Sequence, residues 1–155
     1  MLKSDTCKIF VVESLQYLQK KYHARLLGYV IMPNHIHLIL YYEKENTLSA
    51  FMRDLKKFTF FQIRRELENS NEEMFKKLSY RHRDQLFKVW NDRFDDVWIG
   101  SRELLEVKLD YIHLNPLQEH WNLCSDPTAY FFSSANFYEN NVQAKLTVTH
   151  YRDFF

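Results

Sequence analysis

The sequence predicts an α+β fold, with a mainly antiparallel sheet and helices packed on one face of it. The expected elements follow the order helix, strand, strand, helix, strand region, helix. Only three residues separate the first two strands, and strands joined by so short a turn pair antiparallel. The chain has 155 residues, of which 46% are hydrophobic, so it has the length of one domain and enough apolar side chains for a core.

A helix and a hairpin are expected within the first 42 residues. Ser4 offers an N-cap oxygen to a helix that ends near Tyr22. Apolar residues recur along this helix at a spacing of three: Ile9, Val12, Leu15 and Leu18. Residues 25–31 and 35–42 are short, apolar and β-prone, and a Met-Pro-Asn turn links them, which predicts two antiparallel strands.

Helical periodicity returns in two later segments. Thr47 can cap a second helix, which should give way to a loop at residues 68–73. Ser101 can cap a third helix, which must stop near Pro116. Between them, residues 89–99 predict one bent strand or two short ones. The aromatic segment 130–138 should pack onto the core, and 139–155 should form the C-terminal tail of a single domain spanning residues 1–155.

The composition excludes several classes of protein. Charged residues make up 26% of the chain, which argues against a disordered protein, a coiled coil or a fibre. No window reaches the roughly 18 apolar residues of a membrane span, and we expect no secretory leader. Cys7 and Cys124 are isolated and are interpreted as reduced packing residues. The net charge of +1 suggests no polyanion partner, although residues 53–93 hold 11 Lys and Arg against 7 Asp and Glu.

His35 and His37 are the first candidates for chemistry. Alternate residues of a strand share a face, so both imidazoles should point the same way. Two imidazoles on a rigid strand can bind one divalent cation through one nitrogen each. Two structural histidines held by hydrogen bonds are the commoner explanation for such a pair alone.

Tyr111 and Asn115 form a second candidate pair. They are four residues apart and therefore lie on one face of the third helix, with Lys108 three residues before the tyrosine. The alternative is a partly buried tyrosine whose hydroxyl meets a neighbour, and an asparagine that closes the helix before Pro116.

The two segments occur together as MPNHIHL at residues 32–38 and DYIHLNP at residues 110–116. This combination closely resembles the single-tyrosine HUH transposases of the IS200-like class, with the REP-associated tyrosine transposases as nearest relatives. WNDRF at residues 90–94 is similar to the family's W-x-x-R-F segment, and YFFSS at residues 130–134 to its Y-x-x-S-S segment. The resemblance covers roughly residues 5–138, with the motifs in family order.

The resemblance implies a ferredoxin-like domain that cleaves and rejoins single-stranded DNA beside hairpins. His35 and His37 then bind Mg²⁺ or Mn²⁺, with Asn115 in the position of a third polar ligand. The Tyr111 hydroxyl attacks the scissile phosphate, which gives a 5′-phosphotyrosine bond and a free 3′-hydroxyl. A phenol is a poor nucleophile unless its anion is favoured, and both the cation and Lys108 favour it. Imidazole is softer than the oxygen ligands that Mg²⁺ prefers, so Mn²⁺ should substitute well.

Basic and aromatic side chains extend the expected DNA-binding surface. The candidates for contact with the DNA backbone are Arg53, Lys56, Lys57, Arg93 and Lys108. For Arg93, a surface or core-capping role is the alternative. Trp90 and Trp98 are candidates for base stacking, although core packing is the commoner role. His113 is expected to be structural or to support one of the residues of the site.

The chain departs from the family pattern in two places. After Asn115-Pro116 it continues with Leu117-Gln118-Glu119-His120, which removes a basic side chain that relatives carry. Relatives also have a strand before the first helix, beside the strand that bears the two histidines, and this chain begins only a few residues before that helix. We therefore expect an incomplete sheet with impaired activity, whose open edge is covered by residues 145–149 or by a second subunit.

The sequence thus predicts a transposase whose partner is single-stranded or hairpin DNA. Two rival interpretations remain. One is a domesticated, non-catalytic remnant that only binds nucleic acid, and the other is a metal-dependent hydrolase whose histidines activate water. A homodimer is the expected assembly if the C-terminal segment leaves the sheet edge open. We expect no membrane contact and a location in the bacterial cytoplasm, at the nucleoid.

Overall fold

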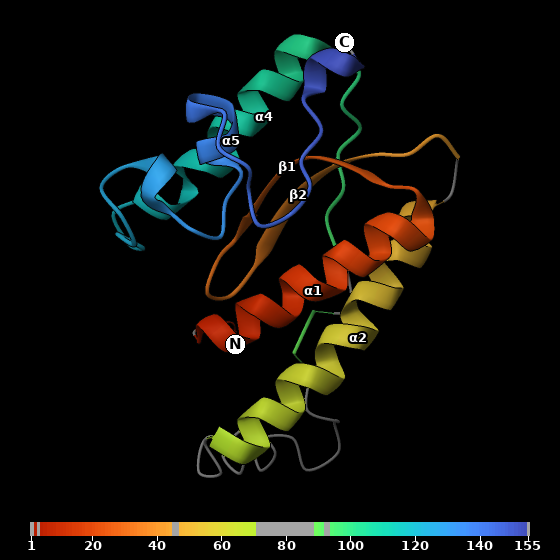
Figure 1. Ribbon diagram of the computed structural model, residues 1–155, viewed down its shortest axis with the longest axis vertical. Coiled ribbons are helices and arrows are strands. Elements are labelled where there is room, and N and C mark those ends of the chain that lie inside the picture. The colour runs from red at the N-terminus through yellow and green to blue at the C-terminus, as the bar shows by residue number, and fades with distance from the viewer. Residues whose placement is uncertain (1, 3, 45–46, 71–88, 92–93, 155) are drawn as a thin grey trace.

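The computed structural model describes residue 2 and residues 4–44, 47–70, 89–91 and 94–154. Its architecture is α+β, as predicted, with one two-stranded antiparallel sheet between layers of helices (Figure 1). Helices α1 (Asp5–Tyr22) and α2 (Thr47–Ser70) lie on one side of the sheet, and α4 (Arg102–Leu114) lies on the other. This arrangement is consistent with a ferredoxin-like fold that lacks strands.

Side-chain caps fix the start of two helices at the predicted residues. The backbone N–H of Cys7 donates to Ser4 Oγ at 3.2 Å at the start of α1. The N–H of Leu104 donates to Ser101 Oγ at 3.3 Å at the start of α4. Helix α4 gives way before Pro116 to a short 3-10 turn, Asn115–Leu117.

The sheet pairs β1 (Arg25–Ile31) with β2 (Ile36–Tyr41). In the register Gly28 lies opposite Ile39 and Val30 opposite His37, so these four residues share one face. That face is the one toward α4, because a Cβ at Gly28 would collide with the Leu109 side chain. The glycine thus lets α4 approach the sheet closely.

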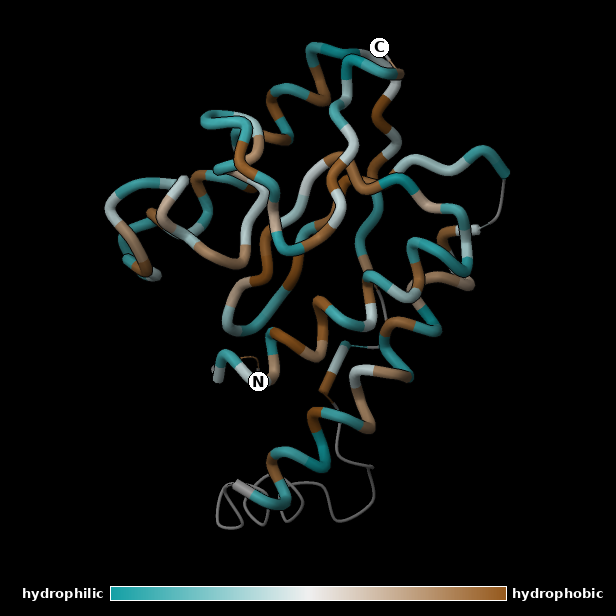
Figure 2. The backbone as a smooth tube through the Cα atoms, viewed as in Figure 1, coloured by the Kyte–Doolittle hydropathy of each residue, from teal (hydrophilic) through white to brown (hydrophobic). Residues whose placement is uncertain are grey.

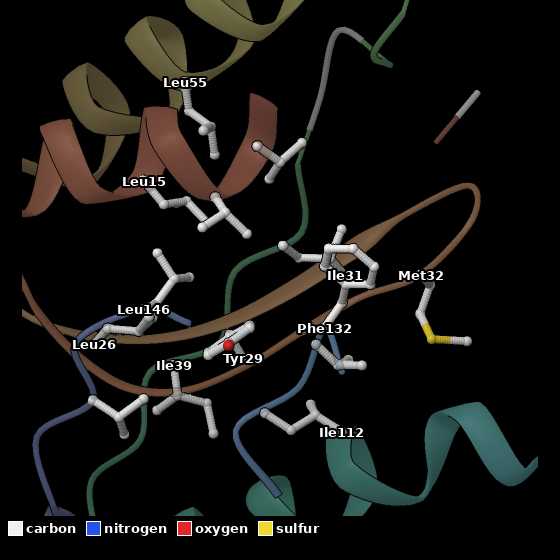
Figure 3. Packing of buried hydrophobic residues seen from close by; sticks show 14 of the residues in the cluster. Leu15, Leu26, Tyr29, Ile31, Met32, Ile39, Leu55, Ile112, Phe132 and Leu146 are labelled. Atoms are coloured by element: carbon white, nitrogen blue, oxygen red, sulfur yellow. The ribbon is translucent and has the colours of Figure 1, made fainter. Parts of the chain in front are cut away.

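The core fills both faces of the sheet. Figure 3 shows Leu15 and Leu55 on the α1 and α2 side, the strand residues between, and Ile112 of α4 on the opposite side. The helices alternate between hydrophobic and hydrophilic residues along their length (Figure 2), as one-sided burial requires. The prediction that helices cover one face holds for α1 and α2 but is wrong for α4, because its apolar stripe packs on the other face.

C-terminal segments cover the edge of β1. The N–H of Ile31 donates to the carbonyl of Phe132, and the N–H of Thr149 donates to the carbonyl of Leu26, both at 2.9 Å. Residues 145–149 therefore do cover an edge, but it is not the expected edge beside the histidine strand. The buried side chains of Leu146 and Val148 hold the segment against β1. Within the described ranges, no other strand pairs with the outer edge of β2.

Two further predictions differ from the structure. Residues 89–91 and 94–100 contain no strand, because β-prone side chains form a strand only where a partner strand pairs with them. Helix α2 continues through Ser70, so the loop predicted at residues 68–73 is wrong at its start, and residues 71–73 lie outside the described residues. Ile63 and Leu67 are buried and hold this end of α2 in helical form.

The described residues carry two free thiols, the buried Cys7 and the half-buried Cys124. Among the helices of the described ranges, none is long and apolar enough to span a membrane.

Candidate active site

Two imidazoles lie side by side where the hairpin turn enters β2. The ring centroids of His35 and His37 are 4.9 Å apart, and the ring planes are inclined by 80°. The N–H of Met32 donates to the carbonyl of His35 at 2.8 Å, which closes the turn that Pro33 and Asn34 favour. Both rings lie on the α4 side of the sheet, since His37 shares a face with Ile39.

The surroundings favour the neutral form of both rings. Burial lowers the pKa of His35, and the nearby His120 lowers it further. Burial also lowers the pKa of His37, with additional effects from His35 and Lys108. A neutral imidazole keeps the lone pair that a metal ligand needs.

The turn also fixes which nitrogen of His35 carries the proton. Nδ1 of His35 donates to Oδ1 of Asn34, so the lone pair lies on Nε2. Histidine ligands of metals usually donate their second ring nitrogen to an oxygen in this way, which fixes both the tautomer and the ring orientation. Asn34 was expected only to favour the turn, and its contact with His35 is visible only in the structure.

Helix α4 brings Tyr111 to the histidine pair. The ring centroids of His37 and Tyr111 are 5.6 Å apart. The buried face of α4, which faces the sheet, carries Leu105, Leu109 and Ile112. Tyr111 precedes Ile112 and therefore lies on a neighbouring face of the helix, beside this contact. Tyr111 is 51% exposed, so its side chain is open to a substrate.

Asn115 lies one helical turn beyond Tyr111 and is only 2% exposed. Its side-chain nitrogen Nδ2 is buried and has no hydrogen-bond partner among the described residues. Buried amides are nearly always paired, so this N–H₂ group is suited to an acceptor oxygen that the protein itself does not supply, and not to a cation.

The donor set fits a cation of intermediate softness. Within the described ranges, no three His, Cys, Asp or Glu side chains converge as a metal site. A cation at the histidine pair would be bound by the imidazoles of His35 and His37, and the amide oxygen of Asn115 is the third ligand that the resemblance implies. Two nitrogen donors and an oxygen donor suit Mn²⁺ better than the all-oxygen shell that Mg²⁺ prefers.

Two residues at this place were not predicted as part of the site. The ring of Trp121 has its centroid 5.9 Å from that of His35, and the ring of His120 has its centroid 5.3 Å from that of Trp121. They follow the Tyr111 helix within ten residues: His120 ends the segment where the chain departs from the family pattern, and Trp121 comes directly after it. Their position after Asn115-Pro116 was the only sequence signal that could have pointed to them.

The basic candidates separate into two groups. Lys108 lies on α4, close enough to His37 to act on its pKa. Arg53, Lys56 and Lys57 lie on α2, across the sheet from α4. Arg53 Nε pairs with Asp54 at 3.2 Å, and Lys56 Nζ donates to the carbonyl of Asn91 at 2.7 Å. The structure does not bring these three to the histidine pair, and Arg93 lies outside the described residues.

The second serine of the Y-x-x-S-S segment is structural. Ser134 Oγ accepts from the N–H of Tyr29 at 2.9 Å and lies 2.8 Å from Nε2 of His113. The Tyr130 hydroxyl donates to the carbonyl of Ile31, also at 2.9 Å. These contacts fasten the segment and α4 to β1, and His113 has the structural one of its two expected roles.

The two predicted tryptophan candidates differ in their surroundings. Trp90 packs on α2, where its Nε1 donates to Thr59 Oγ1 at 2.7 Å, as expected of a packing residue. The expectation of core packing is wrong for Trp98, which is 89% exposed because no described strand covers its segment.

Residues 1–115 match the protein family described as "Transposase IS200 like". The matched range includes the histidine pair, Tyr111 and Asn115. No curated protein and no solved structure matches the chain.

Proposed function

The chain belongs to the IS200-like transposase family, and on this premise we propose that it cleaves and rejoins single-stranded DNA through Tyr111. The observation that carries the proposal is the approach of the Tyr111 ring to within 5.6 Å of His37. A half-exposed tyrosine beside two neutral imidazoles combines a nucleophile with metal ligands at one place.

The reaction is a phosphoryl transfer to the tyrosine. The Tyr111 oxygen forms a bond to the phosphorus as the bond to the 3′-oxygen breaks. The phenol proton passes to solvent, and a proton from solvent completes the 3′-hydroxyl. The 5′-phosphotyrosine bond conserves the energy of the phosphodiester, so a second 3′-hydroxyl reverses the step and joins new ends without ATP.

Each side chain has a separate task in this reaction. His35 and His37 would hold Mg²⁺ or Mn²⁺, with Asn115 as a third ligand. The cation supplies charge withdrawal from the phosphate oxygens. Lys108, three residues before Tyr111 on α4, would add a positive charge near the nucleophile and would favour the phenolate. The proposed substrate is hairpin-flanked DNA. The protein would bind this DNA at the bacterial nucleoid.

A denaturing gel tests the proposal directly. A single-stranded hairpin oligonucleotide labelled at its 3′ end is incubated with the protein and Mn²⁺, since the 3′ fragment is the one that stays on the tyrosine. We expect a labelled protein band that resists denaturation and disappears with EDTA. The same band should be absent from Tyr111→Phe and present in Tyr17→Phe, which changes a tyrosine of similar exposure on α1.

The other outcomes separate the rival functions. Cleavage without a covalent band would indicate a hydrolase in which the histidines activate water. A salt-sensitive complex with neither band nor cleavage would indicate a protein that only binds nucleic acid. A covalent band in the Tyr111→Phe protein would assign the nucleophile to another tyrosine.

A further inference from the structure

The chain beyond the Tyr111 helix makes a fixed turn beside the histidine pair. The N–H groups of Trp121 and Asn122 both donate to the carbonyl of Gln118, at 2.8 and 2.9 Å. The N–H of Leu123 donates back to the carbonyl of Pro116 at 2.9 Å. Asn122 has a φ of 42°, in the left-handed region that asparagine tolerates. The turn therefore holds its side chains in place relative to α4.

Trp121 is the large flat side chain of this turn. Its ring is half-buried, and its centroid lies 5.9 Å from that of His35. The centroid of the exposed His120 ring lies 5.3 Å from that of Trp121, and the two ring planes are tilted by 48°. The indole ring therefore has two imidazole neighbours: His35, which belongs to the histidine pair, and the exposed His120.

Trp121 is a neighbour of His35, so a single strand cleaved at the histidine pair would lie close to the indole. Unpaired bases stack on aromatic side chains, and the contact tolerates every base because each has a π face. The other tryptophans do not lie in this position. Trp90 is engaged with Thr59, and Trp98 belongs to the segment that precedes α4.

We propose that Trp121 is the stacking platform for the unpaired nucleobase next to the phosphate addressed by His35, His37 and Tyr111. This assigns a nucleobase subsite to the turn after α4 and rests on the proposed function. The ligand is a nucleobase of single-stranded DNA.

Binding of two oligonucleotides with equal charge tests the subsite. The probes are a 12-mer of thymidylates and a 12-mer of abasic nucleotides, bound in EDTA to full-length protein carrying Tyr111→Phe. The phosphates contribute equally to both, so the difference in affinity reports on the bases. We expect the thymidylate 12-mer to bind on the order of tenfold more tightly.

Variants test whether Trp121 causes the preference for the thymidylate 12-mer. Trp121→Ala should abolish it and Trp121→Phe should retain part of it, whereas Trp98→Ala should leave it intact. Equal binding of the two probes by the parent protein, no binding of either, or an unchanged preference in Trp121→Ala would each overturn the proposal. The binding assay contains neither a metal ion nor the Tyr111 hydroxyl. Its result is therefore independent of the result of the covalent-band assay.

Photo-crosslinking gives a second measurement on the unsubstituted chain. A thymidylate 12-mer with one 5-iodouracil is irradiated with the protein in EDTA, and the crosslinked residue is identified by peptide sequencing in a mass spectrometer. A crosslink at Trp121 is expected. Crosslinks confined to other residues, such as Trp98, would contradict the subsite whether or not Trp121→Ala folds.

Discussion

Nδ1 of His35 donates to Oδ1 of Asn34, and this one contact leaves Nε2 as the nitrogen that can bind a metal. His37 lies two residues further, with its ring 4.9 Å from that of His35. The pKa of each ring is lowered, mainly by burial, so neither ring needs to lose a proton before binding at neutral pH. Under the proposed function, the pair could therefore bind a cation without first releasing a proton.

Removal of either imidazole should weaken metal binding. We expect His35→Ala and His37→Ala each to lower the affinity for Mn²⁺ by roughly tenfold or more, because each removes one of two nitrogen donors. Isothermal calorimetry measures this affinity. The control is His23→Asn, which removes an exposed imidazole from the left-handed cap of α1. Unchanged affinity in both alanine variants would place the metal elsewhere.

The sequence predicted residues of the site where the signal is local. The spacing of His35 and His37 on a strand, and of Tyr111 and Asn115 on a helix, follows from backbone periodicity. The proximity of Trp121 to His35 depends on how α4 sits on the sheet and how the chain turns after it. No local pattern contains that information, so this residue was not predicted.

At the scale of elements, the distance between α4 and the sheet decides where Tyr111 lies. Gly28 is the point of closest approach, because the Leu109 side chain occupies the space that a Cβ would need. The Ile112 Cδ1 atom is the next neighbour, 3.3 Å from that Cβ position. A larger residue at position 28 must therefore displace the Leu109 side chain, and we expect the packed core to pass this displacement on to α4.

Gly28→Ala tests this close approach. We expect it to lower the free energy of unfolding by about 1–3 kcal/mol, as overpacking of a core usually does. The displacement of α4 should also reduce formation of the covalent band. Urea denaturation measures the stability. Gly100→Ala is the control, since the new Cβ would lie 3.3 Å from Trp98 Nε1, at the end of an exposed side chain. If Gly28→Ala and Gly100→Ala were both as stable as the parent protein, the close approach of α4 at Gly28 would be refuted.

The capped helices and the two strands of the hairpin were predicted correctly, whereas the strand at residues 89–99 and the side of the sheet that α4 covers were not. Helices α1 and α4 begin at Ser4 and Ser101 because the signal is a single side chain beside the helix. The segment 89–99 has the composition of a strand, but strand formation also requires a partner with free hydrogen bonds. The side of the sheet that α4 covers follows from Gly28, a signal that is clear only once the register is known.

At the scale of the molecule, a buried network joins the C-terminal half to β1. His113 lies 2.8 Å from Ser134 Oγ, which also accepts from the N–H of Tyr29. Burial lowers the pKa of His113 from 6.5 to about 4. Above pH 6.5 the His113 ring is neutral in both the folded and the unfolded chain. Between pH 6.5 and about pH 4 the ring binds a proton only in the unfolded chain.

Acid should therefore destabilise the fold. As the pH falls from 6.5 toward 4, we expect the free energy of unfolding to decrease, with a contribution from His113 of about 2 kcal/mol at a pH near 5. Urea denaturation at neutral and acidic pH measures this difference. His113→Gln should reduce the pH dependence, while His23→Asn should not. A His113→Gln protein with the same pH dependence as the parent would contradict the assignment.

The C-terminal segment is a second contribution to the whole fold. Leu146 is fully buried and Val148 and Tyr151 are 7% exposed. Truncation after Asn140 removes these three side chains and the pairing of residues 145–149 with β1. We therefore expect the free energy of unfolding to fall by roughly 5 kcal/mol. Such a loss is a large part of the stability of a domain. Urea denaturation measures it, and light scattering should detect association through the exposed edge of β1. A truncated chain that is monomeric and equally stable would show that the edge needs no cover.

The most direct test of the central claim is to locate the covalent bond to DNA. Proteolysis after glutamate cuts the chain behind Glu106 and Glu119 and releases residues 107–119, in which Tyr111 is the only tyrosine. After incubation with hairpin DNA and Mn²⁺ and nuclease trimming, mass spectrometry of this peptide should show the added nucleotide on Tyr111. An unmodified 107–119 peptide, with the nucleotide on a peptide from another part of the chain, would contradict the account.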